Sequence, residues 1–272
     1  MSKTILITGA STGIGKATAK LFQTRGWNVI ATMRSPDKET ELNAFDNVLV
    51  TRLDVTDQAS IAAAVAAGLE RFGAIDVLLN NAGYGAYGPL EAFSMDSIRR
   101  QFDTNVIGLL ATTKAVLPHM RAAKSGAIVN ISSIGGKMTF PLGTLYHGTK
   151  FAVEGLSEAL HYELESLGIK IKIVEPGAIR TDFGGRSFDF QNDESLSEYQ
   201  PTVHAMLQAM GDLLGENASE ASVVADVVWT AVTDGTAQLR YTAGDDAAEY
   251  MKNRDALDDE AFIGNVKGLL GL

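Results

Sequence analysis

The 272-residue sequence predicts one α/β domain, built on a mostly parallel, doubly wound sheet of seven strands with helices on both faces. Short runs rich in Val, Ile and Leu alternate with longer segments of helical periodicity, which is typical of this fold class. The short runs lack strict polar alternation, as in strands that are covered on both faces. Hydrophobic residues make up 46% of the chain and no linker divides it, so one large core is expected.

The predicted strands and helices alternate along the chain. Strands are expected at residues 4–8, 28–33, 48–53, 77–80, 127–132, 170–175 and 238–242. Helices are expected at residues 14–24, 58–71, 94–120 with a break near Asn105, 145–167 and 220–233. Gly26, Gly73 and Gly168 are placed to end three of these helices. Within the single domain of residues 1–272, residues 183–215 are predicted to form a substrate-binding lid and residues 243–272 a C-terminal extension.

Gly9, Gly13 and Gly15 occupy the turn between the first strand and the first helix. Glycine there allows a tight turn and a close approach of the backbone to a pyrophosphate, which the helix N-terminus then attracts. The spacing G-x-x-x-G-x-G differs from the G-x-G-x-x-G fingerprint, and an ordinary βα turn is the alternative. With a strand before it and a helix after it, the turn favours a nucleotide-binding site.

The same turn also fits the G-x-S-x-G nucleophile elbow of α/β-hydrolases, with Ser11 as the nucleophile. Such an elbow normally lies deep in the sheet order rather than at the first strand. The chain also has no His-Gly-Gly oxyanion segment. The hydrolase is therefore the less favoured interpretation.

Tyr146 and Lys150 stand four residues apart, one helical turn, and Ser133 precedes Tyr146 by thirteen residues. Reduction of a carbonyl by hydride leaves an alkoxide that needs a proton, and a tyrosine can supply it. A cation ~4 Å from the phenolate contributes up to ~4 kcal/mol at an effective dielectric of ~20, so Lys150 is expected to bring the tyrosine pKa near neutrality. Ser133 is expected to donate a hydrogen bond to the substrate oxygen. The alternative for Tyr-x-x-x-Lys is a surface helix pair.

Two neighbours of these residues are given other roles. Ser132 is interpreted as a strand-end cap. His147 adjoins Tyr146, but adjacent residues on a helix face different ways, so it is expected in the pocket wall or at the surface rather than in catalysis.

Further motifs occur in order along the chain: Asn-Asn-Ala-Gly at residues 80–83, Asn105, and Pro-Gly at residues 176–177 followed by Thr181. Together with the glycine turn, Ser133, Tyr146 and Lys150, they make the chain resemble a classical short-chain dehydrogenase/reductase over essentially its full length. It most resembles the 17β-hydroxysteroid dehydrogenase-like and retinol dehydrogenase-like branch. The resemblance implies a Rossmann-type domain with Asn105, Ser133, Tyr146 and Lys150 as the catalytic set. It also implies that Asn105 holds a water in the proton relay and that Lys150 hydrogen-bonds the nicotinamide ribose.

The end of the second strand predicts the cofactor. An NAD site usually has an acidic residue there, whereas this chain has Met33 followed by Arg34, which suits a 2′-phosphate. NADP(H) is therefore expected, and a solvated surface arginine is the alternative. The resemblance adds contacts to the adenine, ribose and carboxamide. The complete predicted cofactor set is Gly9, Ser11, Thr12, Gly13, Ile14, Gly15, Arg34, Asp54, Val55, Asn81, Ala82, Gly83, Tyr146, Lys150, Pro176, Gly177, Ile179 and Thr181.

The expected pocket wall is apolar, which predicts an NADPH-dependent carbonyl reductase, or alcohol dehydrogenase in reverse, that acts on a lipophilic ketone or aldehyde. A 3-oxoacyl-thioester reductase and an NADP-binding regulator without turnover are the alternatives. The wall residues are Tyr84, Tyr87, Met138, Phe140, Phe183, Phe188, Phe190, Met206 and Met210.

Composition and charge exclude several other classes. The net charge of -10 argues against nucleic acid and anionic membrane surfaces. The chain has no cysteine, which excludes disulfides and cysteine-ligated zinc, and its four histidines lack the H-E-x-x-H context, so no metal is expected. No signal peptide and no apolar run of ~18 residues are found, which favours the cytoplasm. The family resemblance also implies a homodimer or homotetramer, with Leu156, Leu160 and Leu164 either at its interface or in the core.

Overall fold

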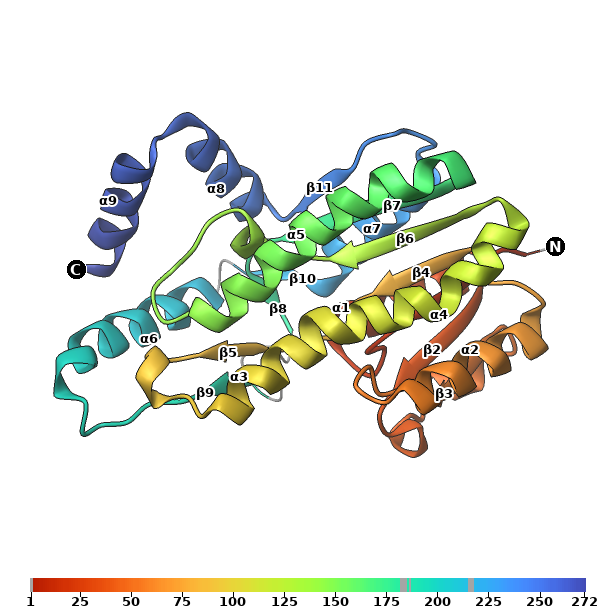
Figure 1. Cartoon of the computed structure of the whole chain (residues 1–272), viewed down its shortest axis with the longest axis horizontal. Helices are drawn as coiled ribbons and strands as arrows, with labels where there is room; N and C mark the ends of the chain where they lie inside the picture. The colour runs from red at the N-terminus through yellow and green to blue at the C-terminus, as the bar shows by residue number, and fades with distance from the viewer. Residues whose placement is uncertain (1, 182–184, 186, 215–217) are drawn as a thin grey trace.

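The computed structural model describes residues 2–181, 185, 187–214 and 218–272, and places seven parallel strands in one central sheet. Their spatial order is β11-β7-β6-β4-β1-β2-β3 (Figure 1). The strands are β1 (Thr4–Ile7), β2 (Asn28–Met33), β3 (Val48–Arg52), β4 (Val77–Asn80), β6 (Gly126–Ile131), β7 (Ile169–Pro176) and β11 (Arg240–Ala243). All seven predicted strands are thus confirmed with shifts of at most two residues at either end.

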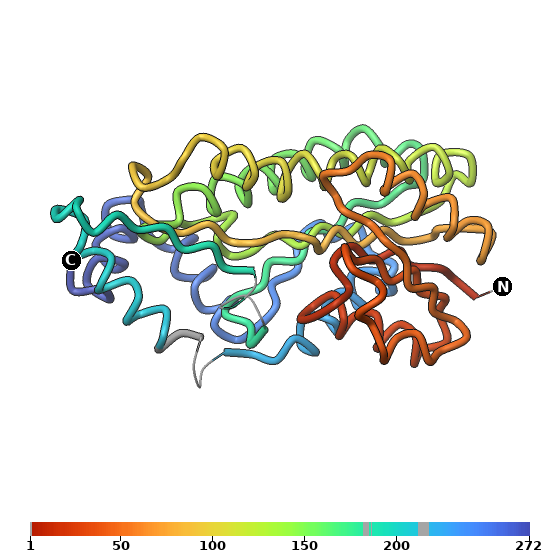
Figure 2. The backbone as a smooth tube through the Cα atoms, turned by 90° about the horizontal axis from the view of Figure 1, so that it is seen from below, coloured from red at the N-terminus to blue at the C-terminus, as the bar shows by residue number. Residues whose placement is uncertain are grey.

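Helices cover both faces of this sheet (Figure 2). One face carries α1 (Gly13–Thr24) and α7 (Ala221–Thr233), which pack against each other. The other carries α2 (Gln58–Phe72), α4 (Gly108–Ala123) and α5 (Thr144–Leu164). Leu164 and Leu160 pack in the core on this second face. For these two residues, the core alternative is therefore confirmed over the subunit interface. The homo-oligomer stays a prediction.

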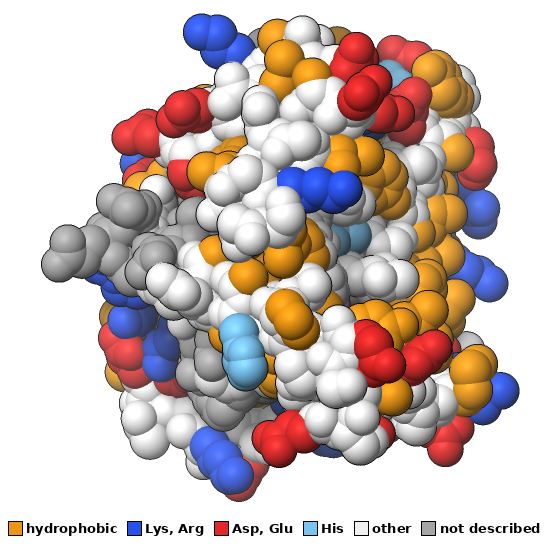
Figure 3. All heavy atoms as spheres, turned by 90° about the vertical axis from the view of Figure 1, so that its left-hand side faces the viewer, with side chains coloured by type: hydrophobic (Ala, Val, Ile, Leu, Met, Phe, Trp, Pro, Cys, Tyr) orange, Lys and Arg blue, Asp and Glu red, His pale blue; other side chains and the backbone are white. Residues whose placement is uncertain are grey.

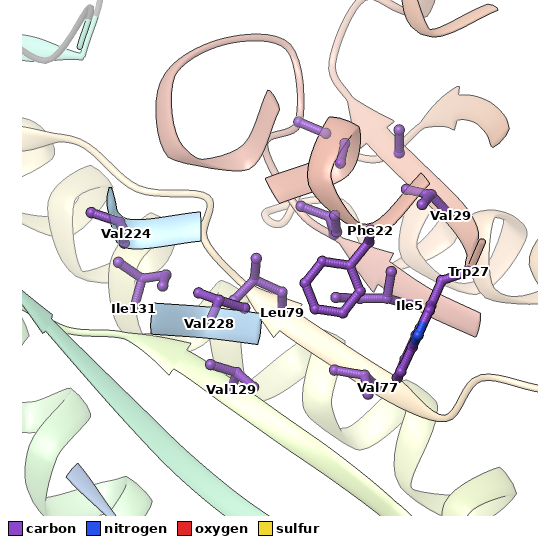
Figure 4. Packing of buried hydrophobic residues seen from close by; sticks show 14 of the residues in the cluster. Ile5, Phe22, Trp27, Val29, Val77, Leu79, Val129, Ile131, Val224 and Val228 are labelled. Carbon is purple, nitrogen blue, oxygen red and sulfur yellow. The ribbon is translucent and has the colours of Figure 1, made fainter. Parts of the chain in front are cut away.

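Large aromatic side chains fill the core beneath α1 and α7. Phe22 and Trp27 meet edge to face with ring centroids 5.1 Å apart, and Trp229 lies 5.1 Å from Phe22. Branched aliphatic side chains of β1, β2, β4 and β6 surround them (Figure 4). Because both faces of the sheet are buried in this way, its strands read as continuous apolar runs.

The predicted break in the third helix is confirmed. The segment consists of α3 (Met95–Phe102), a π-helical turn (Asp103–Ile107) that contains Asn105, and α4. Such π-turns inside helices are frequent at functional sites.

Smaller elements lie beyond the carboxyl ends of the strands. β5 (Gly85–Tyr87) pairs with β9 (Phe188–Phe190), and β8 (Ile179–Arg180) pairs with β10 (Ser219–Glu220). The helical part of the predicted lid is α6 (Gln200–Leu214), whereas Phe183 and Gly215 lie outside the described residues. Short 3-10 turns are η1 (Pro36–Lys38), η2 (Leu42–Ala44), η3 (Leu90–Ala92), η5 (Ile134–Gly136), η6 (Glu165–Leu167) and η8 (Ser197–Tyr199).

The C-terminal extension forms two helices that the sequence did not predict, α8 (Asp245–Ala256) and α9 (Asp259–Leu270). They lie at the end of the molecule opposite the N-terminus, and α9 contacts α6 (Figure 1). In the described part of the chain, no helix is long and apolar enough to cross a membrane.

Candidate active site

A cavity of about 1310 Å³ opens at the carboxyl ends of the central strands. The chain order reverses between β1 and β4, and open α/β sheets bind ligands in the crevice at such a switch point. The glycine turn, Ser133, Tyr146 and Lys150 all line this one cavity. Every predicted cofactor residue lines it except Gly15, and every predicted catalytic residue lines it except Asn105.

The glycine turn has the conformation that its sequence predicts. Gly9 and Gly13 adopt φ of 69° and 53°, which side chains with a Cβ rarely tolerate. A Cβ on Gly15 would lie 2.3 Å from the Gly9 carbonyl oxygen, so glycine is needed there to let α1 pack against the turn. Thr12, the N-cap of α1, makes no side-chain capping hydrogen bond to the first helical turn. The turn therefore forms the kind of backbone cradle that suits a pyrophosphate.

Asn81 at the end of β4 holds this turn in place. Its Nδ2 donates to the carbonyl oxygens of Thr8 and Gly9 at 2.9 and 3.1 Å. In return, the Thr8 hydroxyl accepts hydrogen bonds of 3.0 Å from the backbone N–H groups of Asn81 and Ala82. The Asn-Ala-Gly stretch thus acts on the cofactor site partly by bracing the neighbouring strand end.

Ser133, Tyr146 and Lys150 meet deep in the cavity. The Tyr146 hydroxyl hydrogen-bonds the Ser133 side chain, whose oxygen accepts a 3.0 Å hydrogen bond from the Gly135 N–H. Lys150 Nζ lies 5.6 Å from the centre of the Tyr146 ring and donates to the Ile131 carbonyl oxygen at 2.8 Å. A hydroxyl that can give a proton is therefore fixed beside a buried cation.

Burial dominates the ionisation of both groups. It raises the pKa of Tyr146 to about 12, against a smaller opposite effect of the Ser133 hydrogen bond. It lowers the pKa of Lys150 to about 8, against the opposite effect of the Glu154 charge. The expectation of a tyrosine pKa near neutrality is therefore wrong for this arrangement, because loss of hydration penalises the phenolate more than the hydrogen bond to Ser133 stabilises it. Tyr146 keeps its proton at neutral pH.

Asn105 lies behind the cavity wall in the π-helical turn, where it is almost fully buried. Its side-chain oxygen accepts from the Tyr84 N–H at 3.1 Å, and its Nδ2 donates to the Tyr84 carbonyl and the Thr149 hydroxyl. It thereby ties the π-turn to α5 and to the loop before β5. Its role with a water stays a prediction.

The cofactor-selecting position lies at the end of β2. Met33 is buried, whereas Arg34 is exposed, and both line the cavity. Among the described residues, Arg34 has no hydrogen-bond or ion-pair partner, so its guanidinium is available to a ligand in the cavity. Asp54 is anchored locally, since its Oδ1 accepts from the Thr56 N–H and hydroxyl at 3.0 and 2.7 Å.

His147 and Ser132 differ in outcome. His147 lines the cavity, as predicted, with its Nε2 accepting from the Phe140 N–H at 3.0 Å and its Nδ1 bonded to the Gly135 carbonyl at 2.9 Å. Burial lowers its pKa, and hydrogen bonds occupy both of its ring nitrogens. Ser132 is not a cap: its buried Oγ has no hydrogen-bond partner within the described residues.

Apolar side chains share the substrate end of the cavity with Arg100, Asp189 and Gln208, and its wall differs from the predicted set. Tyr84, Tyr87, Phe140, Met206 and Met210 line it as predicted. Met138 instead packs in a core with Ile134 and Phe262, because it follows η5 beneath the C-terminal helices. Phe188 packs on Tyr87 outside the lining, Phe190 lines a separate surface hollow, and Phe183 is outside the described residues. Unpredicted wall residues come from α8 and the end of the chain: Tyr250, Val266, Leu269, Leu270 and Gly271.

Asp246, in the first turn of α8, is another residue that the sequence analysis missed. Its Oδ2 accepts a 2.6 Å hydrogen bond from the Ala178 N–H, and a Cβ on Gly177 would lie 2.2 Å from the same oxygen. The C-terminal extension thus holds the cavity-lining loop after β7. Its position after a predicted strand and Gly244 could have indicated the start of a helix, since acidic residues favour helix N-termini.

Comparison with known proteins agrees with this geometry. The family described as short chain dehydrogenase matches residues 3–192, more than half of the chain. The chain belongs to this family. An uncharacterized oxidoreductase of Schizosaccharomyces pombe is 43% identical to this chain over 243 residues, 88% of this chain and 100% of the relative. Retinol dehydrogenase 8 of Homo sapiens is 38% identical over 220 residues, 78% of this chain and 69% of the relative.

Solved structures resemble this chain in the same way. A short-chain dehydrogenase from Streptomyces avermitilis superposes with a TM-score of 0.81 at 35% identity, covering 94% of this chain and 92% of that one. ElxO with NADP bound superposes with a TM-score of 0.73 at 30% identity, covering 89% and 97%. The protein is thus an oxidoreductase of the short-chain family with the family's fold, and the hydrolase interpretation is wrong.

Proposed function

We propose that this dehydrogenase uses NADPH to reduce the carbonyl group of a lipophilic ketone or aldehyde. The observation that carries the proposal is the Tyr146 hydroxyl, held by Ser133 in the same cavity as the glycine turn and Arg34. Burial keeps that hydroxyl protonated at neutral pH, so it can act as the proton donor that carbonyl reduction requires.

Reduction of a carbonyl requires a hydride at carbon and a proton at oxygen. A nicotinamide cofactor supplies the hydride when it is bound. Tyr146 gives its proton to the substrate oxygen, and Ser133 holds the tyrosine hydroxyl in place. The positive charge of Lys150, one helical turn away, stabilises the negative charge that develops on Tyr146 as the proton leaves.

The choice of NADPH rests on the end of β2. Met33 occupies the position where a carboxylate would accept from a ribose hydroxyl, and the exposed Arg34 beside it suits a 2′-phosphate. The Gly9 and Gly13 conformations and the close packing at Gly15 fit a bound pyrophosphate. The NADP that ElxO holds supports the same choice.

The apolar wall supports a lipophilic substrate. Side chains of α6 and α9 line the cavity, and apolar patches lie on this end of the surface (Figure 3). Large apolar side chains on these two helices and just beyond α9 remain exposed: Leu207, Ile263, Leu269 and Leu272. Such a wall binds chiefly through the apolar area that it removes from water. The similarity to a retinol dehydrogenase is consistent with that chemistry.

Steady-state NADPH oxidation with a panel of carbonyl compounds tests the proposal. We expect lipophilic ketones or aldehydes to be reduced faster than 3-oxoacyl thioesters or small polar carbonyls. Tyr146→Phe should lose ~10²–10⁴-fold in turnover and keep NADPH affinity, because only the proton donor is removed.

Tyr87→Phe is the matched control. Its ring lies 5.4 Å from Tyr146 in the same cavity, but no proton transfer is assigned to it, so turnover should stay within about threefold of the parent. Parent-like turnover in Tyr146→Phe with normal cofactor binding would refute Tyr146 as the proton donor, whereas a parent that binds NADPH but reduces no carbonyl compound would favour the NADP-binding regulator.

A further inference from the structure

A pair of buried glutamates lies next to the proton-transfer site. Tyr146, Lys150, Glu154 and Glu158 follow each other at intervals of four residues along one side of α5. Glu154 is only 5% exposed, and Glu175 on β7 is only 2% exposed. Carboxyl groups are rarely buried so completely unless they are paired, and the reduction chemistry leaves these two without a role.

The two carboxyl groups lie against each other. Glu154 is within hydrogen-bonding reach of Glu175, yet the Oε1 atoms of both lack a donor within the described residues. Two ionised carboxylates cannot occupy such a buried contact, since like charges in a poorly hydrated site repel strongly. One proton between the two carboxyl groups would turn this contact into a hydrogen bond.

The charges around the pair are too few to neutralise two carboxylates. Arg240 on β11 contacts Glu154 Oε2 at 2.9 Å and approaches Glu175 Oε1 at 3.8 Å, but it also pairs with the half-exposed Glu158 at 2.6 Å. Lys137, at the end of η5, and Lys150 are the other cations that act on the two glutamates. Burial and the neighbouring Glu154 raise the pKa of Glu175 to about 7.

We propose that Glu154 and Glu175 share one proton, and that the single negative charge of the pair keeps Lys150 protonated during turnover. The pair therefore acts as a positioning element, and its effect on turnover rests on the proposed reduction. Lys150 is partly buried and has one carbonyl, that of Ile131, as its hydrogen-bond acceptor among the described residues. A nearby negative charge is what such a buried ammonium needs to stay charged.

Sharing a proton predicts how variants behave. In Glu154→Gln or Glu175→Gln, the remaining carboxyl can release its proton and supply the same single charge. Each single variant should then leave the pH dependence of reduction within about 0.3 units of the parent. The double variant has no charge left and should lose activity at a pH lower by about one unit, as Lys150 deprotonates earlier.

Thermal unfolding tests the shared proton without any activity. The folded protein holds a proton on a carboxyl whose unfolded pKa is near 4.5, so its stability declines as pH rises from about 5 to above 7. In Glu175→Gln the melting temperature should fall by roughly 5 °C less over that range. Glu158→Gln, which alters a more exposed partner of the same arginine, should show the parent's decline.

The two readouts separate the possible failures. The shared proton would be overturned by either of two results. One is a melting temperature that falls with pH in Glu175→Gln as much as in the parent. The other is a single variant that loses reduction activity at as low a pH as the double variant. If the parent reduces no carbonyl compound, the proposed function fails, and the melting curves alone then decide whether the pair holds a proton.

Discussion

Lys150 lies with its ammonium 5.6 Å from the centre of the Tyr146 ring, one helical turn along α5, yet it donates its hydrogen bond to the Ile131 carbonyl. Because both groups are buried, the tyrosine pKa rises to about 12 and the lysine pKa falls to about 8. The site therefore brings its proton donor and its cation together in protonated form. Of these two groups, the lysine has the pKa that is closer to neutrality.

This order of pKa values predicts the pH dependence of reduction. Tyr146 stays protonated until about pH 12, whereas Lys150 loses its charge as pH rises through about 8. The kcat/KM for carbonyl reduction should therefore be level below pH 7 and fall above pH 8. Lys150→Met should lose ~10²-fold in turnover and show no such fall. If kcat/KM still falls above pH 8 in Lys150→Met, the titration belongs to another group.

Arg34 is predicted to select the phosphorylated cofactor. Arg34→Asp should weaken NADPH binding by ~10–100-fold, because a charge-assisted contact of ~1.5–3 kcal/mol is lost, and should leave NADH binding nearly unchanged. Fluorescence titration of both cofactors measures the effect. Lys38→Asp makes the same charge change a few residues away, outside the cavity lining, and should alter neither affinity. An equal loss for both cofactors would exclude contact with the 2′-phosphate.

Asp246 is predicted to hold the loop after β7 in its binding conformation. Asp246→Ala removes the acceptor of the Ala178 N–H and should weaken NADPH binding by ~10-fold, since a hydrogen bond to a charged group contributes ~1.5–3 kcal/mol. Asp246→Asn keeps an acceptor oxygen and should retain most of the affinity. Asp245→Ala, at the exposed neighbouring position, is the control. Normal affinity in Asp246→Ala would mean that the loop holds its shape unaided.

Gly15 is predicted to be irreplaceable at the glycine turn. In Gly15→Ala, the new Cβ would meet the Gly9 carbonyl oxygen at 2.3 Å, so the turn must shift and the protein should lose ~1–3 kcal/mol of stability together with most of its NADPH affinity. Gly155→Ala is the matched control inside α5, where a Cβ meets nothing within 4 Å, and it should stabilise the protein slightly. Denaturant unfolding and cofactor titration report the two effects.

Most of the central fold could be predicted from the sequence. The seven strands, the helices between them and the break at Asn105 follow from local patterns: apolar runs, helical periodicity and glycines that end helices. The group of Ser133, Tyr146 and Lys150 was also readable, since one helical turn fixes the spacing of the last two. These features depend on residues that are close together in the sequence, so the sequence alone is enough to predict them.

The rest was decided by packing between distant segments. α8 has only a weak apolar stripe, and only in the fold do α8 and α9 cover the cavity and bring Asp246 to Ala178. Glu154 and Glu175 are twenty-one residues apart and meet only because α5 crosses β7. The sequence by itself determined which groups can carry the chemistry. Tertiary structure decided their ionisation, because a pKa depends on burial and on charges brought close by the fold, and neither is a property of local sequence.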